Sequence, residues 1–164
     1  MIFGTTLLTF VHVAISLVGL GSGLVVMYGL LAAKRSESWT ATFLVSTVLT
    51  SATGFLFPFE RFLPSHALSI LSLLVLAVAI FARYARHLAG AWRQAYVATA
   101  VTALYFNFFV LVVQLFQKVP VLKAMAPTQS EPPFLLTQVI LLAAFVVAGV
   151  AAAIKNRNQT VRVG

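Results

Sequence analysis

The chain has 164 residues, of which 61% are hydrophobic and 9% charged, and its mean hydropathy is +1.02. Soluble domains carry charge on roughly a quarter of their residues, so this composition excludes a soluble globular domain and predicts a membrane protein. The net charge of +8 does not indicate nucleic-acid binding, because the basic residues stand at the ends of apolar runs, and the lack of cysteine excludes disulfides and thiolate metal sites.

Five apolar segments follow one another along the chain, each close to the roughly 20 residues that a helix needs to cross the bilayer hydrocarbon. They cover residues 5–33, 40–58, 65–85, 94–118 and 134–154. The first has no basic stretch before it and no small-residue cleavage site, which favours a retained span over a signal peptide. The sequence predicts an all-α transmembrane helical bundle of five spans in a single domain, residues 1–164, with a polar tail after residue 154 that is expected to fray.

The lysines and arginines divide unequally between the two sides that these spans define. One side carries eight of them: Lys34, Arg35, Arg83, Arg86, Arg93, Lys155, Arg157 and Arg162. The other side carries three: Arg61, Lys118 and Lys123. Because cytoplasmic loops collect basic residues, we expect the amino terminus outside and the carboxyl terminus in the cytoplasm.

The fourth segment carries two amides on one helix face. Asn107 and Gln114 are seven residues apart, and Ala100 and Ala103 continue the same face towards the other end. An amide in a lipid-spanning helix is costly unless it finds a partner. This face is therefore predicted to look into the bundle.

The outer and inner halves of the predicted spans differ in composition. The outer halves hold the stronger hydrogen-bonding side chains, and the residues predicted to bind a ligand are His12, Ser16, Thr53, Asn107, Gln114 and Gln138. The inner halves hold small residues at four-residue spacing, as at Gly19 and Gly23 or at Ala144, Ala148 and Ala152, which lets helices approach closely.

This asymmetry predicts a bundle that is tightly closed on the cytoplasmic side and has a polar pocket towards the outer leaflet. The pocket would receive a hydrophobic ligand (lipid, quinone or haem) or a partner helix. In the alternative, serine and threonine bond their own helix carbonyls, the amides pair across helices, and there is no cavity. The sequence leaves both interpretations open.

Two histidines of the outer half, His12 and His66, are candidate axial ligands of a haem b or ligands of another metal ion. The span boundaries place them at depths that differ by roughly 8 Å, which strains such a pair. The alternative is a neutral His12 imidazole that bonds Asn107 or a hydroxyl. His87 falls at the cytoplasmic end and is interpreted as an interfacial residue.

The carboxylates offer no support for catalysis. Glu37, Glu60 and Glu131 all lie in predicted loops, and neither a nucleophile elbow nor a zinc-binding histidine motif occurs. We therefore expect a non-enzymatic membrane subunit or binding protein. A b-type haem electron carrier and a small-solute or ion transporter remain as alternatives.

Three runs resemble a group of small uncharacterised bacterial inner-membrane proteins. They are TSATGFLFPF at 50–59, ALYFNFFVLVVQLFQKVP at 103–120 and APTQSEPPF at 126–134. The resemblance covers most of the chain and implies a multi-pass protein of the bacterial inner membrane, with the lipid bilayer as its surroundings. It implies nothing about chemistry, and a membrane-protein partner or a homo-oligomer stays open.

Overall fold

The computed structural model describes residues 2–32, 34, 36–56 and 64–162, with side chains for residues 7–157 of these ranges apart from 64 and 65. The described chain is helical and contains no strand. In order, the elements are α1 (Ile2–Ala32), α2 (Glu37–Gly54), α3 (Pro64–Ile80), the π-helix η1 (Phe81–Ala85), α4 (Ala91–Lys118), α5 (Pro120–Met125) and α6 (Pro132–Arg162).

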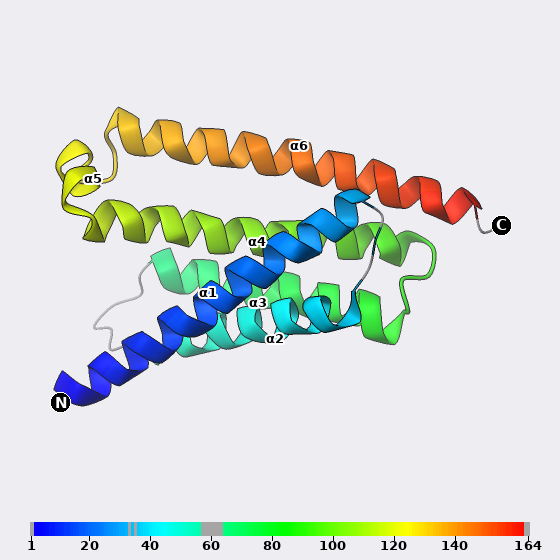
Figure 1. Cartoon of the computed structure of the whole chain (residues 1–164), viewed down its shortest axis with the longest axis horizontal. Helices are drawn as coiled ribbons and strands as arrows, with labels where there is room; N and C mark the ends of the chain where they lie inside the picture. Colours follow the sequence, from blue (N-terminus) through cyan, green and yellow to red (C-terminus); the bar gives the residue numbers. More distant parts are fainter. Residues whose placement is uncertain (1, 33, 35, 57–63, 163–164) are drawn as a thin grey trace.

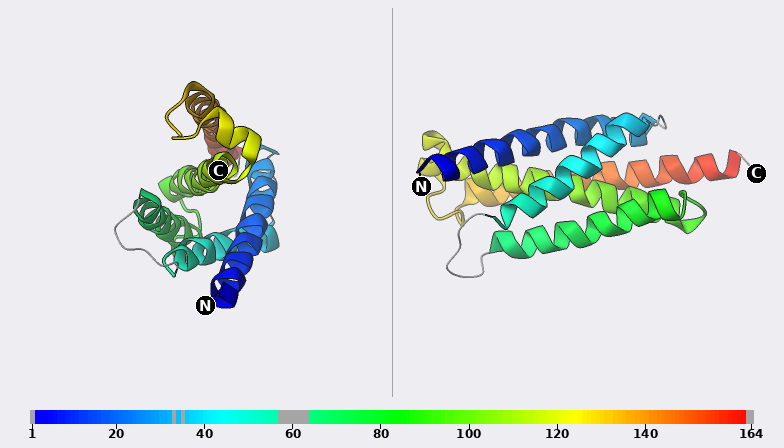
Figure 2. Two further views of the ribbon diagram at one scale, coloured as in Figure 1. Left: turned by 90° about the vertical axis from the view of Figure 1, so that its left-hand side faces the viewer. Right: turned by 90° about the horizontal axis from the view of Figure 1, so that it is seen from below.

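The long helices form an elongated bundle with α4 at its centre (Figure 1, Figure 2). α4 contacts α1, α3 and α6, while α2 packs against both α1 and α3. One end of the bundle, the α5 end, holds the start of α1, the end of α2 and α5 itself (Figure 1). The opposite end, the η1 end, holds the end of α1, the start of α2, η1 and the end of α6 (Figure 1).

The helices follow the predicted spans closely, except that α6 continues well beyond residue 154. Four helices of the described chain are long and apolar enough to cross a membrane, namely α1, α3 together with η1, α4 and α6. α2 is less apolar, because eight of its 18 residues are serine or threonine. The fifth span therefore stays a prediction. The predicted end of that span at Pro58, and Arg61 in the turn after it, lie outside the described residues.

A tightly packed layer, here called the Gly23 layer, crosses the middle of the bundle. A Cβ added at Gly23 would lie 2.4 Å from Leu104 Cδ1 and 3.0 Å from the Phe43 ring. From this layer towards the η1 end, the core also contains buried alanines of α3, η1, α4 and α6: Ala79, Ala82, Ala100, Ala103 and Ala152. At Gly23 and Ala152 the predicted close packing of small residues is confirmed. Gly21 has nothing near it, and Ala144 is exposed.

Two segments differ from the sequence-based expectation. The connection between the fourth and fifth spans contains a helix, α5, whose first residue Pro120 needs no amide hydrogen there. The tail expected to fray after residue 154 instead continues as helix to Arg162. The reason is visible at Asn156, which is 1% exposed and donates hydrogen bonds to Leu30 O (3.0 Å) and Ala152 O (2.7 Å). This amide ties the end of α6 to the end of α1.

Candidate functional site

A cavity of about 550 Å³ lies between α1, α2, α3 and α4, in the half of the bundle towards the α5 end. We call it the His12 cavity. Its volume falls within the roughly 300–1,000 Å³ of small-molecule sites. Predicted site residues from three helices line it together: His12, Ser16, His66, Asn107 and Gln114. The α4 face that carries Asn107 and Gln114 thus borders the cavity, and its continuation at Ala100 and Ala103 is buried.

Polar contacts between helices border this cavity. His12 Nδ1 lies 2.7 Å from Thr53 Oγ1, which joins α1 to the end of α2. Asn107 Nδ2 donates to Thr47 Oγ1 over 3.3 Å, a long and therefore weak bond. The His12 imidazole is thus bonded to a hydroxyl, as one of the two sequence-based alternatives held.

The remaining wall of the cavity is mostly apolar. Aliphatic and aromatic side chains of α1, α3 and α4 provide it: Val13, Leu17, Leu20, Leu68, Phe106, Val110, Leu111 and Leu115. Lys118 contributes the cationic group, and no carboxylate occurs among the described residues that line the cavity. The lining suits a largely apolar molecule that carries hydrogen-bond acceptors.

Serine and threonine hydroxyls at the cavity bond carbonyls of their own helices, as the alternative interpretation without a cavity expected. Ser16 Oγ donates to His12 O over 2.7 Å, and Thr50 Oγ1 donates to Ser46 O over 2.8 Å. Such bonds to the preceding turn satisfy a hydroxyl at little cost. Self-bonded hydroxyls and a cavity therefore occur together, and these hydroxyls line the cavity without needing a ligand.

Gln138 does not belong to this group. It is buried on α6 against α4, where its Nε2 donates to Phe109 O over 3.3 Å, and it does not line the His12 cavity. Sequence reasoning gave its depth along the bundle but not the side of α4 on which α6 packs. Thr53 reaches the site only through its contact with His12.

His12 and His66 lie closer in height than the span boundaries suggested. A Cβ added at Gly54 would lie 4.0 Å from His12 Cε1 and 3.5 Å from Ser69 Oγ. His66 is three residues before Ser69, which at 1.5 Å per residue leaves a difference of about one helical turn. The residues described hold no group of three or more His, Asp or Glu side chains that could bind a metal ion.

Comparison with family models, with curated proteins and with solved structures gave no match. The structure has a second cavity, at the opposite end of the bundle.

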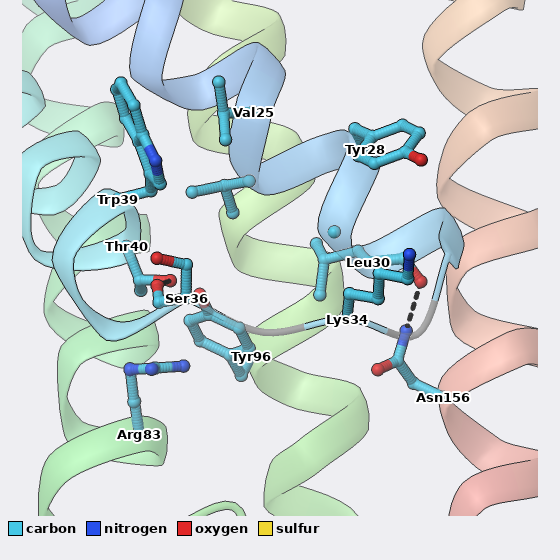
Figure 3. A pocket seen from close by; sticks show the side chains of 12 residues that line it. Val25, Tyr28, Leu30, Lys34, Ser36, Trp39, Thr40, Arg83, Tyr96 and Asn156 are labelled. Atoms are coloured by element: carbon cyan, nitrogen blue, oxygen red, sulfur yellow. Dashed lines mark hydrogen bonds between the residues drawn. The ribbon is translucent and has the colours of Figure 1, made fainter.

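This second cavity, of about 190 Å³, lies at the η1 end, and we call it the Arg83 cavity (Figure 3). Lys34, Thr40, Arg83, Tyr96 and Asn156 are among the residues that line it. In Figure 3 the Arg83 guanidinium extends beside the Tyr96 ring, and the dashed line marks the bond from Asn156 to Leu30 O. The buried core of the bundle also extends into the η1 end, so this smaller cavity lies beside closely packed side chains.

Sequence reasoning missed the role of Arg83. It treated this residue as a basic group at the end of a span, whereas its side chain is only 5% exposed. Arg83 Nη2 donates to Glu37 Oε1 over 2.7 Å, and its guanidinium carbon lies 5.4 Å from the centre of the Tyr96 ring. Two features of the sequence could have indicated this ion pair. Arg83 lies inside the predicted span 65–85, and Glu37 lies just before the preceding span. His87, predicted to be interfacial, is exposed in the turn after η1.

Proposed function

We propose that the protein is a non-enzymatic, five-span protein of the bacterial inner membrane that binds one hydrophobic ligand with a polar head in the His12 cavity. The observation that carries the proposal is the cavity itself, about 550 Å³ in volume, with apolar walls and with imidazole and amide groups in its lining. Pockets of this size and character are the usual sites of small-molecule binding.

The arrangement of the helices supports five spans with the α5 end outside. With 18 residues, α2 is about 27 Å long, close to the roughly 30 Å of bilayer hydrocarbon. The start of α1 and the end of α6 lie at opposite ends of the bundle, which fits an odd number of crossings (Figure 1). Lys34, Arg83 and Lys155 belong to the η1 end, so the positive-inside rule favours that end as cytoplasmic.

The polar groups of the cavity favour a ligand that accepts hydrogen bonds. Lys118 can only donate, and the amides of Asn107 and Gln114 each have donors to offer. The described lining has no carboxylate that would attract a cation. A lipid head or a quinone carbonyl supplies the acceptors, while a tail lies along the leucines and valines of α1 and α4.

The decisive experiment counts the ligand molecules that remain on the purified protein in native mass spectrometry. Ser16→Leu fills the cavity, and we expect at least tenfold lower occupancy, which corresponds to about 1.4 kcal/mol of binding free energy. Thr102→Leu is the matched control, because both hydroxyls donate only to their own helix over 2.7 Å and Thr102 does not line the cavity. Wild-type protein without a bound ligand, or equal occupancy in both variants, would refute the proposal.

A b-type haem carrier is the second candidate, because both His12 and His66 line the same cavity. Expression with haem available, followed by an absorption spectrum of the purified protein, tests it. If this candidate is correct, a Soret band is present, and His12→Ala and His66→Ala each abolish it while His87→Ala at the η1 end leaves it unchanged. A spectrum without a Soret band eliminates haem and leaves the lipid or quinone ligand.

A further inference from the structure

The Arg83 cavity contains buried donors that have no acceptor. Arg83 Nε and Tyr96 Oη are both buried, and neither makes a hydrogen bond within the described residues. Both residues line the cavity. Burying a donor without a partner costs about 1–3 kcal/mol, so native proteins seldom keep two such groups around one empty space.

Three main-chain carbonyls around the same cavity already accept hydrogen bonds. Gly29 O accepts from Lys34 N over 2.8 Å, and Leu30 O accepts from Asn156 Nδ2 over 3.0 Å. Ser36 O accepts twice, from the Thr40 amide over 3.1 Å and from the Thr40 hydroxyl over 2.8 Å. An occupant would therefore meet the unbonded donors of Arg83 and Tyr96 beside carbonyls that already accept a hydrogen bond.

The charged residues of the cavity also favour an occupant that accepts hydrogen bonds. Lys34 and Arg83 line it, whereas no carboxylate does among the described residues. Glu37 bonds Arg83 from outside: its side chain is 82% exposed and is not part of the lining. A group that accepts several hydrogen bonds and carries negative charge satisfies the site, and an arginine beside hydroxyl donors is well matched to an oxyanion.

We propose that the Arg83 cavity binds a phosphate group, either as the head of an anionic phospholipid or as inorganic phosphate. Exposed aromatic residues flank the cavity at Tyr28 and Trp39, as is typical of the depth at which lipid heads lie. Basic pockets between membrane helices bind such heads. This site is separate from the His12 cavity, because the Gly23 layer lies between them.

Trp39 lines the cavity and provides a direct readout of binding. The chain has two tryptophans, so Trp92→Phe leaves Trp39 as the reporter of fluorescence in maltoside micelles. One arm titrates potassium phosphate against potassium chloride at constant ionic strength. The other titrates dioleoylphosphatidylglycerol against dioleoylglycerol, which lacks the phosphate. A saturable change in either phosphate arm supports the site, and the arm that saturates identifies the source.

Tyr96→Phe separates binding from folding, because it removes a buried hydroxyl that makes no hydrogen bond of good geometry in the described structure. We expect five- to tenfold weaker phosphate binding and an unchanged or higher melting temperature of the unliganded protein. Lys34→Gln should weaken binding several-fold without affecting folding, since Lys34 is exposed. Tyr84→Phe is the matched control: its ring also lies near Arg83, at 5.8 Å, but it does not line the cavity.

Two results would overturn the proposal. One is the lack of saturation in both phosphate arms, checked in wild-type protein by ³¹P line broadening so that Trp92→Phe is not needed. The other is binding that Tyr96→Phe and Tyr84→Phe weaken equally. In either case Arg83 would serve only to join η1 to α2 through Glu37.

Discussion

The His12 cavity and the Arg83 cavity lie on either side of the Gly23 layer, and they satisfy their polar groups in different ways. Around the larger cavity, serine and threonine hydroxyls bond the preceding turn of their own helix, as Ser16 does. Around the smaller one, the buried Arg83 donates from Nη2 to an exposed glutamate, Glu37, while its Nε makes no hydrogen bond. Self-satisfied hydroxyls allow a wide space to stay open at low cost, whereas buried charge favours a small site for a specific anion.

The largest expected effect comes from breaking the layer that separates the two cavities. Gly23→Leu places carbon where even a Cβ would be too close to Leu104 and 3.0 Å from Phe43, so these side chains, or the helices that carry them, must move. We expect a loss of about 3 kcal/mol in the free energy of unfolding, at the upper end of overpacking effects. Gly21→Leu is the control, since nothing lies within 4 Å of a Cβ there. The melting temperatures in detergent compare them, and equal stability would show that the layer is not tightly packed.

A pair of identical substitutions compares the polar residues of the two cavities. Asn156→Leu removes donors to Leu30 O and Ala152 O at a site that is 1% exposed, and we expect a loss of about 2 kcal/mol. Asn107→Leu removes one bond of 3.3 Å at a half-buried position, and we expect less than about 1 kcal/mol. Urea unfolding curves in micelles measure both. The comparison fails if Asn107→Leu costs as much as Asn156→Leu, because Asn107 would then be a structural residue.

These pairs show which features a sequence can specify. Helix bounds were predictable because bilayer thickness fixes the length of an apolar run. The helical period was enough to bring Asn107 and Gln114 to one face. The contact between Arg83 and Glu37, which are 46 residues apart, was not predictable. The depth of a residue along its helix does not determine which neighbouring helix its side chain contacts. For the same reason the sequence could not show that Gln138 packs against α4 away from the His12 cavity.

A smaller effect is expected at the ion pair beside the Arg83 cavity. Glu37→Gln removes the counter-charge of Arg83, but the acid is 82% exposed, so we expect a loss of at most about 1 kcal/mol that diminishes with salt. Phosphate binding should strengthen a few-fold, since a nearby negative charge is gone. Glu131→Gln at the α5 end is the control for loss of a carboxylate. Weaker phosphate binding in Glu37→Gln would mean that the pair positions Arg83 for the ligand.

The smallest effect concerns Glu131, which lies outside the predicted spans and outside both cavities. The Thr128 hydroxyl donates to its carboxylate over 2.7 Å, and backbone amides of Thr128 and Ser130 add to this, which lowers the pKa of Glu131 below its ordinary value of 4.5. Because the pKa of Glu131 is lower in the folded state, its carboxylate stabilises the start of α6 at pH values above the ordinary pKa. This contribution is lost as the pH falls through the lowered pKa. Carbon-13 NMR of the glutamate carboxyls measures the titration, and Thr128→Val should raise the pKa towards 4.5.

This titration also tests whether the His12 cavity is independent of Glu131. No carboxylate lines that cavity among the described residues, so ligand binding there should stay constant while Glu131 titrates. Binding in the His12 cavity that falls in parallel with Glu131, and shifts with it in Thr128→Val, would show that the start of α6 is coupled to the site. Because α6 reaches α1 and α4 directly, such coupling would extend the ligand site beyond the four helices that line it.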